Sequence, residues 1–150
     1  MADILIVEDE KAMQDIIAEY MRKGGHTCFT ADDGVDALVL LKNHPVDLMI
    51  LDVMIPHLDG FFVCQTAREM SNMPIIMLTH KEYELLSFFM ANPGQIFSRE
   101  QLLNRIWGYD FAGTPRTLDT HMQTLQQKLG GEGRRIVTLI RSGYKFEVNS

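Results

Sequence analysis

Residues 47–60 read DLMILDVMIPHLDG, and this stretch decides the fold. The continuous apolar run at 48–51 is typical of a strand that is buried on both faces. Asp52 closes the run, and Pro56 and the pair Asp59-Gly60 follow as turn signals. A buried strand that ends in a carboxylate points to a parallel sheet with a ligand site at the carboxyl ends of its strands.

The sequence on both sides of this stretch alternates between strand and helix patterns. Further strands are predicted at 4–7, 26–30 and 74–79, and helices at 11–23, through 37–41 and at about 61–70. The resulting order, βαβαβαβ, predicts an α/β fold in which helices cover both faces of a parallel sheet.

Acidic residues stand where these strands end. Glu8 and Asp9 follow the first strand, and Asp52 closes the third. Parallel strands bring their carboxyl ends to one edge of the sheet, so we expect the three carboxylates to converge. A hard cation relieves their repulsion, and Mg²⁺ prefers such oxygen ligands. The alternative is that the acids only cap strands where loops meet water.

Three segments carry a specific resemblance: ILIVEDE (4–10), DLMILDVMIPHLDG (47–60) and PIIMLT (74–79). Over nearly all of residues 1–79 they resemble the receiver domain of two-component response regulators. The resemblance implies a flavodoxin-like sheet of order 2-1-3-4, without the usual last strand and flanking helices. It implies a sensor histidine kinase as partner, Asp52 as the phosphoacceptor and Thr79 as the switch hydroxyl. The implied Mg²⁺ ligands are Glu8, Asp9, Asp52 and the backbone carbonyl of Met54.

The charge balance changes sign along the chain. Residues 1–79 carry 5 Lys and Arg against 13 Asp and Glu, whereas residues 80–150 carry 9 against 7. This asymmetry indicates two modules with different partners. In the second module we predict helices at about 80–91, 98–107 and 115–129, the last capped by Thr114-Pro115, and a hairpin of strands at 134–139 and 144–148. Three helices and a hairpin predict a winged helix-turn-helix.

Residues 81–108, 116–130 and 135–147 resemble the winged-helix effector domain of DNA-binding response regulators of the OmpR/PhoB type. The resemblance implies that helix 115–129 enters the major groove of double-stranded DNA and that the hairpin reaches a minor groove. The expected DNA contacts are Arg116, Thr117, Thr120, His121, Gln123, Thr124 and Gln127 on the helix, and Arg141, Ser142, Gly143 and Tyr144 in the hairpin. Gln123, Thr124 and Gln126 replace arginines of many family members, so we expect weak, salt-sensitive binding.

The dipeptide Leu78-Thr79 joins the two resemblances. A receiver would continue with a helix, a strand ending in Lys-Pro and a last helix, and an effector would begin with its own small sheet, but neither segment is present. The sequence therefore predicts two shortened domains, 1–79 and 80–150. We expect helix 80–91 to pack back as the fourth helix of the receiver. A capping box from Thr79 to Glu82 would compete for the switch hydroxyl, and Lys81 is a weak substitute for the missing lysine.

The composition narrows the function classes. No apolar run approaches the roughly 20 residues of a membrane helix, the N-terminus is acidic, and two cysteines favour neither a disulfide scaffold nor a zinc site. We expect a cytoplasmic transcriptional regulator and no enzyme, with a homodimer as a further candidate. Two alternatives stay open: a chimeric or remnant interaction module impaired in signalling and DNA binding, and a Mg²⁺-dependent phosphohydrolase with Asp52 as nucleophile. The second is disfavoured because Met54, not an acid, stands two residues on.

Overall fold

The computed structural model describes residues 1–111 and 113–147. The chain forms two compact units, Met1–Tyr83 and Glu84–Ser150. Their boundary falls inside helix α4 (His80–Ala91), whose first turn belongs to the first unit. Within the described residues, no helix is long and apolar enough to cross a bilayer.

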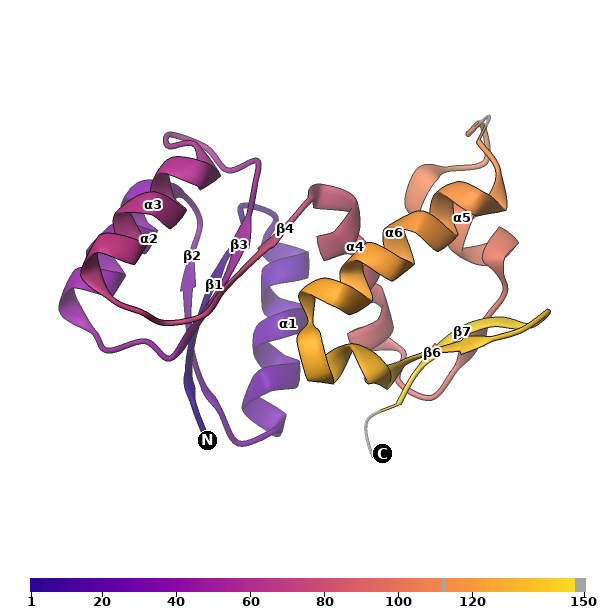
Figure 1. Cartoon of the computed structure of the whole chain (residues 1–150), viewed down its shortest axis with the longest axis horizontal. Helices are drawn as coiled ribbons and strands as arrows, with labels where there is room; N and C mark the ends of the chain where they lie inside the picture. The colour runs from indigo at the N-terminus through magenta and orange to yellow at the C-terminus, as the bar shows by residue number, and fades with distance from the viewer. Residues whose placement is uncertain (112, 148–150) are drawn as a thin grey trace. The chain divides into compact units, whose positions relative to one another are not determined.

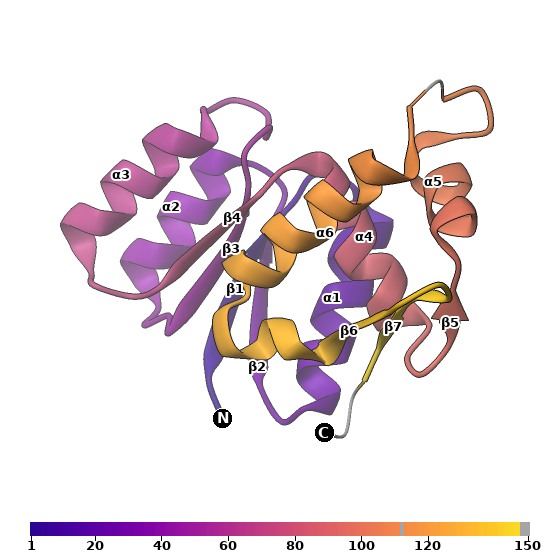
Figure 2. The same cartoon turned by 45° about the vertical axis from the view of Figure 1, so that its right-hand side comes forward.

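The first unit is built on a parallel sheet of order β2-β1-β3-β4. Its strands are β1 (Asp3–Val7), β2 (Thr27–Ala31), β3 (Leu48–Asp52) and β4 (Ile75–Leu78). Helix α1 (Lys11–Lys23) covers one face, and α2 (Gly34–Asn43) and α3 (Gly60–Met70) cover the other (Figures 1 and 2). The predicted fold class and strand order are confirmed, and the predicted element bounds hold to within a few residues.

Coverage of both faces explains why these strands read as continuous apolar runs. Leu5 and Val7 pack with Leu51 and with Val63 of α3 in one core cluster. Ile6 is equally buried, and alternation along a strand turns it to the opposite face. Full burial of one such side chain contributes roughly 1.5–3 kcal/mol.

Glycine is required where α3 begins. A Cβ atom on Gly60 would lie 2.7 Å from the carbonyl oxygen of Val53 and 2.9 Å from that of Asp52. The preceding Asp59 caps the helix, because its Oδ1 accepts a hydrogen bond from the backbone N–H of Phe61 at 2.7 Å. The loop after β3 is therefore held against the end of that strand.

The second unit contains α5 (Arg99–Trp107), α6 (Pro115–Lys128) and an antiparallel sheet of order β5-β7-β6. The sheet strands are β5 (Ile96–Phe97), β6 (Ile136–Leu139) and β7 (Gly143–Phe146). The predicted helices and hairpin are confirmed. The predicted hairpin start at 134 is wrong, because residues Gly130–Arg135 form a 3₁₀ helix η1 with Arg135 paired to Glu132. The predicted end at Val148 lies outside the described residues.

Local capping signals predict the two effector helices with different success. Ser98 and Gln101 form the expected capping box at the start of α5. The predicted cap of α6 is confirmed, since Thr114 is its N-cap residue and Pro115 occupies the first turn, but the cap uses the backbone: the carbonyl of Thr114 accepts from the N–H of Thr117 at 3.0 Å. Sequence reasoning also missed β5, which has only two residues and therefore no readable period.

Candidate functional sites

Two predicted carboxylates lie side by side at the carboxyl ends of β1 and β3. The strands are adjacent with Val7 opposite Leu51, so Glu8 and Asp52 are the next pair along. Glu8 is 0% exposed and Asp52 is 1% exposed. Glu8 Oε1 accepts a hydrogen bond from the N–H of Glu10 at 3.3 Å, and Asp52 Oδ1 accepts from the N–H of Met54 at 2.9 Å. Backbone donors thus fix the orientation of both carboxylates.

The second oxygen of each carboxylate is the unusual feature of the pair. Within residues 1–111 and 113–147, Glu8 Oε2 and Asp52 Oδ2 are buried without a hydrogen-bond donor. Burial raises the pKa of Glu8 to about 9, and the neighbouring carboxylate of Asp52 contributes to the increase. Two ionised carboxylates are stable in this position only with a shared proton or a cation between them. Oxygen atoms of this kind fit a divalent cation such as Mg²⁺.

Asp9 and Met54 occupy a more open position than Glu8 and Asp52. Both residues line a hollow of about 420 Å³, together with Pro56, Asp59 and other residues of the loop after β3. Asp9 is exposed, and so is the side chain of Met54 at 76%. The structure therefore brings Glu8 and Asp52 together, and it places the third predicted acid on the solvent side of β1.

Sequence reasoning missed His80, which joins the buried carboxylates. One ligand atom each of Glu8, Asp52 and His80 lies within 4.8 Å of the other two. His80 is the first residue of α4, its side chain is 42% exposed, and its Nε2 lies 3.8 Å from Glu10 Oε1. The available signal was a histidine directly after the fourth strand, at the same sheet edge as the acids.

Thr79 begins α4 through the predicted capping box. Its N–H donates to Glu82 Oε1 at 2.8 Å, and its hydroxyl oxygen accepts from the N–H of Glu82 at 3.3 Å. Thr79 is exposed, whereas Glu82 is buried. The hydroxyl keeps its own proton for donation, but the cap constrains its rotation.

Tyr83 fixes the first turn of α4 against the sheet. Its fully buried hydroxyl lies 2.8 Å from the carbonyl oxygen of Ile50 and 3.2 Å from that of Val7, and both carbonyls accept. Burial raises the pKa of Tyr83 well above its usual value, and the charges of Glu8 and Asp52 add to the increase. This contact confirms that the helix starting at 80 packs against residues 1–79 through its first turn.

Helix α6 separates a buried stripe from a polar face, as predicted. Leu118, Met122 and Leu125 are 0% exposed. The predicted DNA-contacting residues on this helix are exposed at Arg116, Thr120, Gln123 and Gln127, and half-buried at Thr117, His121 and Thr124. Two of the threonine hydroxyls donate to backbone carbonyls one turn earlier, at 3.0 Å. His121 lies edge-on to Trp107 with ring centroids 5.0 Å apart.

The hairpin divides its four predicted DNA contacts between surface and core. Arg141 and Ser142 are exposed at the tip, whereas Gly143 is buried. Tyr144 is 3% exposed, and its hydroxyl donates to Asp119 Oδ1, which also accepts from Arg99 Nε at 2.9 Å. Burial and this contact raise the pKa of Tyr144 to about 12. The side chain of Tyr144 therefore holds β7 against α5 and α6.

Gln126 has a similar internal role. Its amide Nε2 donates to the carbonyl of Ile136 at 2.8 Å and thereby links α6 to β6. Gln126, a position where the family resemblance led us to expect an arginine, is thus half-buried and bonded to the hairpin.

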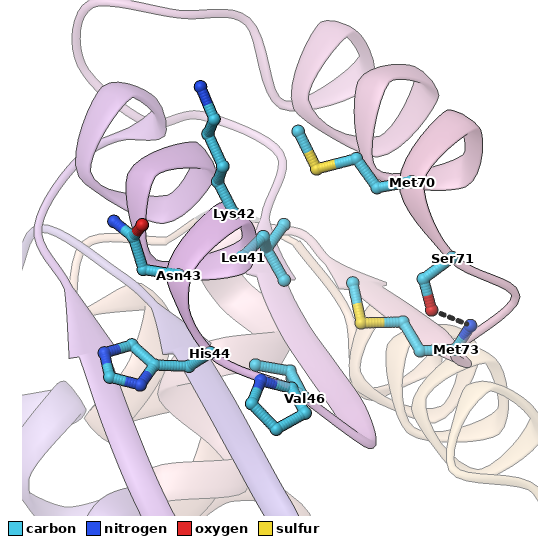
Figure 3. Close-up of a pocket in the computed structure, with 9 residues that line it drawn as sticks. Leu41, Lys42, Asn43, His44, Val46, Met70, Ser71 and Met73 are labelled. Atoms are coloured by element: carbon cyan, nitrogen blue, oxygen red, sulfur yellow. Dashed lines mark hydrogen bonds between the residues drawn. The ribbon is translucent and has the colours of Figure 1, made fainter.

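A separate hollow of about 390 Å³ lies at the opposite end of the first sheet (Figure 3). Residues 41–46, which precede β3, and Met70, Ser71 and Met73, which precede β4, line it. Ser71 there accepts a hydrogen bond from the N–H of Met73 at 3.1 Å. The hollow is therefore remote from the carboxyl ends of the strands, where the acids lie.

Comparison with known families agrees with the two-part architecture. The family described as "Response regulator receiver domain" matches residues 4–92, and the family described as "Transcriptional regulatory protein, C terminal" matches residues 73–146. The chain belongs to the response regulators of two-component systems, with a receiver and a DNA-binding domain of the OmpR type. Both matches include β4 and α4, so this segment carries the signature of each domain.

The curated relatives that match this chain are named as regulators. The "Uncharacterized transcriptional regulatory protein YclJ" of Bacillus subtilis (strain 168) is 26% identical over 223 positions, which cover 96% of this chain and 98% of that protein. The "Heme response regulator HssR" of Staphylococcus aureus (strain MRSA252) is 26% identical, covering 98% and 99%. A chain in the crystal structure of the histidine kinase ThkA in complex with the response regulator protein TrrA is 32% identical, covering 54% of this chain and 71% of that chain, with a TM-score of 0.51.

The length of the alignment shows that this chain is shorter than a relative that it matches almost from end to end. Its alignment with YclJ spans 223 positions, whereas the chain has 150 residues, so at least 73 positions have no counterpart here. Because the match covers 98% of that relative, most of these positions are internal. The overlap of the two family matches at 73–92 agrees with a junction in this region.

Proposed function

We propose that this response regulator accepts a phosphoryl group on Asp52 with the help of Mg²⁺, and that α6 reads double-stranded DNA. One observation carries the phosphorylation half of the proposal. Glu8 and Asp52 are buried together at the carboxyl ends of adjacent strands, and no donor among the described residues reaches one oxygen of each. A stable protein retains such groups where a ligand compensates them.

Each residue of the site would have a separate role in phosphoryl transfer. Bound Mg²⁺ would neutralise charge on the phosphoryl oxygens and on the acceptor. Glu8, Asp9, Asp52 and the carbonyl of Met54 are its proposed ligands. The N–H of Met54 holds Asp52 Oδ1, which fixes the rotation of the nucleophilic carboxylate. The hydroxyl of Thr79 would donate a hydrogen bond to the transferred phosphoryl group. Its bond from the N–H of Glu82 constrains the direction of this donation.

The donor in this proposal is a sensor histidine kinase. The family match supplies the first support, and the similar chain in the complex of ThkA with TrrA supplies the second. Phosphohydrolase activity receives no such support, since both family matches describe regulatory domains.

DNA recognition is assigned to the exposed part of the predicted interface. Arg116, Gln123 and Gln127 present charge and amide groups on the polar face of α6, and Arg141 and Ser142 present the hairpin tip. Glutamine pairs with adenine in the major groove, and each arginine adds a phosphate contact. With two arginines in this set, we expect weak binding that falls steeply with salt.

A second candidate is an interaction module that folds but signals poorly. Two observations favour it: the hydroxyl of Thr79 takes part in a helix cap, and at least 73 aligned positions of a relative are absent. In this case the two domains would bind partners without phosphorylation-dependent coupling.

Incubation with Mg²⁺ and a small phosphodonor, followed by intact-mass measurement, separates the two candidates. The proposal predicts the addition of one phosphoryl group to the native chain and none to Asp52→Asn, with Asp36→Asn as a matched control that is phosphorylated normally. A native chain whose mass does not change in Mg²⁺ supports the interaction module instead.

A further inference from the structure

Glu8, Asp52 and His80 form a cluster that differs in kind from the all-oxygen site expected for Mg²⁺. Their ligand atoms lie within 4.8 Å of one another, on three separate segments: the end of β1, the end of β3 and the start of α4. The two carboxylates are at least nine-tenths buried, and backbone N–H groups occupy Glu8 Oε1 and Asp52 Oδ1. The oxygens left for a ligand are Glu8 Oε2 and Asp52 Oδ2.

The imidazole changes which cation the cluster prefers. Mg²⁺ favours oxygen ligands, whereas an imidazole nitrogen suits Zn²⁺, Co²⁺ and other first-row transition ions. Carboxylate oxygens and imidazole nitrogens are both ligands of Zn²⁺, and a site with three protein ligands keeps a further position for water. Glu10 Oε1 lies 3.8 Å from His80 Nε2, and a neighbouring carboxylate is the usual partner that orients a metal-bound histidine.

We propose that Glu8, Asp52 and His80 bind a transition-metal ion of the Zn²⁺ class, and that this ion competes with Mg²⁺ for the two buried carboxylates. The two binding modes share Glu8 and Asp52 and differ in the remaining ligand. Asp9 belongs to the Mg²⁺ mode and is exposed on the solvent side, whereas His80 belongs to the Zn²⁺ mode. The side chain of His80 is 42% exposed, so the cluster is open to ions from solution.

The low cysteine content does not count against this site. Two free cysteines disfavour a zinc site built from thiolates, but a site of carboxylates and imidazole needs no cysteine. The inference uses the carboxylates of the proposed phosphoacceptor site, and it does not require that Asp52 is phosphorylated.

Calorimetric titration of the full chain with Zn²⁺, and separately with Mg²⁺, tests the proposal. The variants are His80→Gln, Asp9→Asn and His57→Gln, where His57 is a 65% exposed histidine beside Asp33 that serves as the matched control. We expect His80→Gln to weaken Zn²⁺ binding by at least about tenfold and to leave Mg²⁺ binding unchanged. Asp9→Asn should do the reverse, and His57→Gln should match the native chain for both ions. In the native chain, added Mg²⁺ should lower the apparent Zn²⁺ affinity.

Co²⁺ provides a readout that is independent of heat changes and of activity. The visible absorption of bound Co²⁺ reports nitrogen coordination, so the native spectrum should change in His80→Gln and persist in Asp9→Asn. Circular dichroism of each variant checks that it is folded. Zn²⁺ affinity and Co²⁺ spectra that are the same in His80→Gln and in the native chain would overturn the proposal, whatever the result of the phosphorylation experiment.

Discussion

The two units differ in how their acidic side chains are paired. In the first unit, Glu8 and Asp52 lie side by side, and each has one oxygen that no donor in the described part of the chain contacts. In the second unit, Asp119 accepts from both Arg99 and Tyr144, and the guanidinium of Arg99 lies 5.1 Å from the centroid of the Tyr144 ring. A satisfied network of this kind stabilises a fold, whereas an unsatisfied pair costs stability until a ligand binds. Hydrogen bonding thus distinguishes the cluster around Asp119, which stabilises the fold, from the pair of Glu8 and Asp52, which is suited to bind a ligand.

The largest predicted effect concerns the anchor beside the unsatisfied pair. Replacement of Tyr83 by Ala removes a fully buried aromatic side chain and should cost about 4 kcal/mol of unfolding free energy. Tyr83→Phe removes only the donor to Ile50 and Val7, and should cost about 1 kcal/mol. Urea denaturation of both variants measures the difference. A Tyr83→Phe variant that is as stable as the native chain would show that the hydroxyl does not help to fix α4.

The satisfied network should respond strongly when its acceptor is removed. Asp119→Ala leaves the buried hydroxyl of Tyr144 and the guanidinium of Arg99 without their shared partner, and should cost about 2 kcal/mol. Unfolding of the second unit, followed by the fluorescence of Trp107, measures this loss. Asp110→Ala, an exposed acid in the same unit, is the control and should be neutral. A stable Asp119→Ala variant would remove the basis of the comparison.

Removing one charge from the pair of Glu8 and Asp52 should stabilise the protein, whereas removing Asp119 should destabilise it. Because the pKa of Glu8 is raised from 4.5 to about 9, its contribution to stability is full below pH 4.5 and is lost as the pH rises toward 9. Without divalent cations, Glu8→Gln should therefore flatten this pH dependence and be about 1–2 kcal/mol more stable than the native chain near pH 8. Denaturation curves across this pH range, with exposed Glu69→Gln as control, measure the change. A less stable Glu8→Gln variant would argue that the pair is already compensated.

The smallest effect is expected at the DNA interface. Arg116→Ala should weaken DNA binding several-fold at all sequences and reduce the slope of log affinity against log salt by about one. Fluorescence anisotropy at several salt concentrations measures both quantities. Lys42→Ala, in the first unit, is the matched loss of an exposed cation and should leave the slope unchanged. Identical slopes for Arg116→Ala and the native chain would remove α6 from the interface.

Local signals explain which parts of this structure could be predicted. Apolar runs and helical periodicity predicted the strands and the helices, and short motifs predicted the caps at Thr79 and Ser98. Strand order followed from the family resemblance, and it placed Glu8 next to Asp52.

Packing between distant segments explains what could not be predicted. His80 reaches the carboxylates only because α4 begins at the edge of the sheet, and no sequence period encodes that contact. Tyr144 follows a turn and reads as part of an exposed hairpin, yet its hydroxyl finds Asp119, 25 residues away. Strand β5 exists because β7 pairs with it, and not because of any pattern in its two residues.

Thermal unfolding with and without Mg²⁺ tests the central claim most directly, namely that the donor-free oxygens of Glu8 and Asp52 are reserved for a cation. A ligand present at 100 times its dissociation constant stabilises the folded state by about 2.7 kcal/mol. We predict that Mg²⁺ at 100 times its dissociation constant raises the melting temperature of the native chain near pH 8 by the shift that corresponds to about 2.7 kcal/mol. Asp52→Asn should lose most of this shift. A native chain that does not respond to Mg²⁺, or an equal response in Asp52→Asn, would contradict the account.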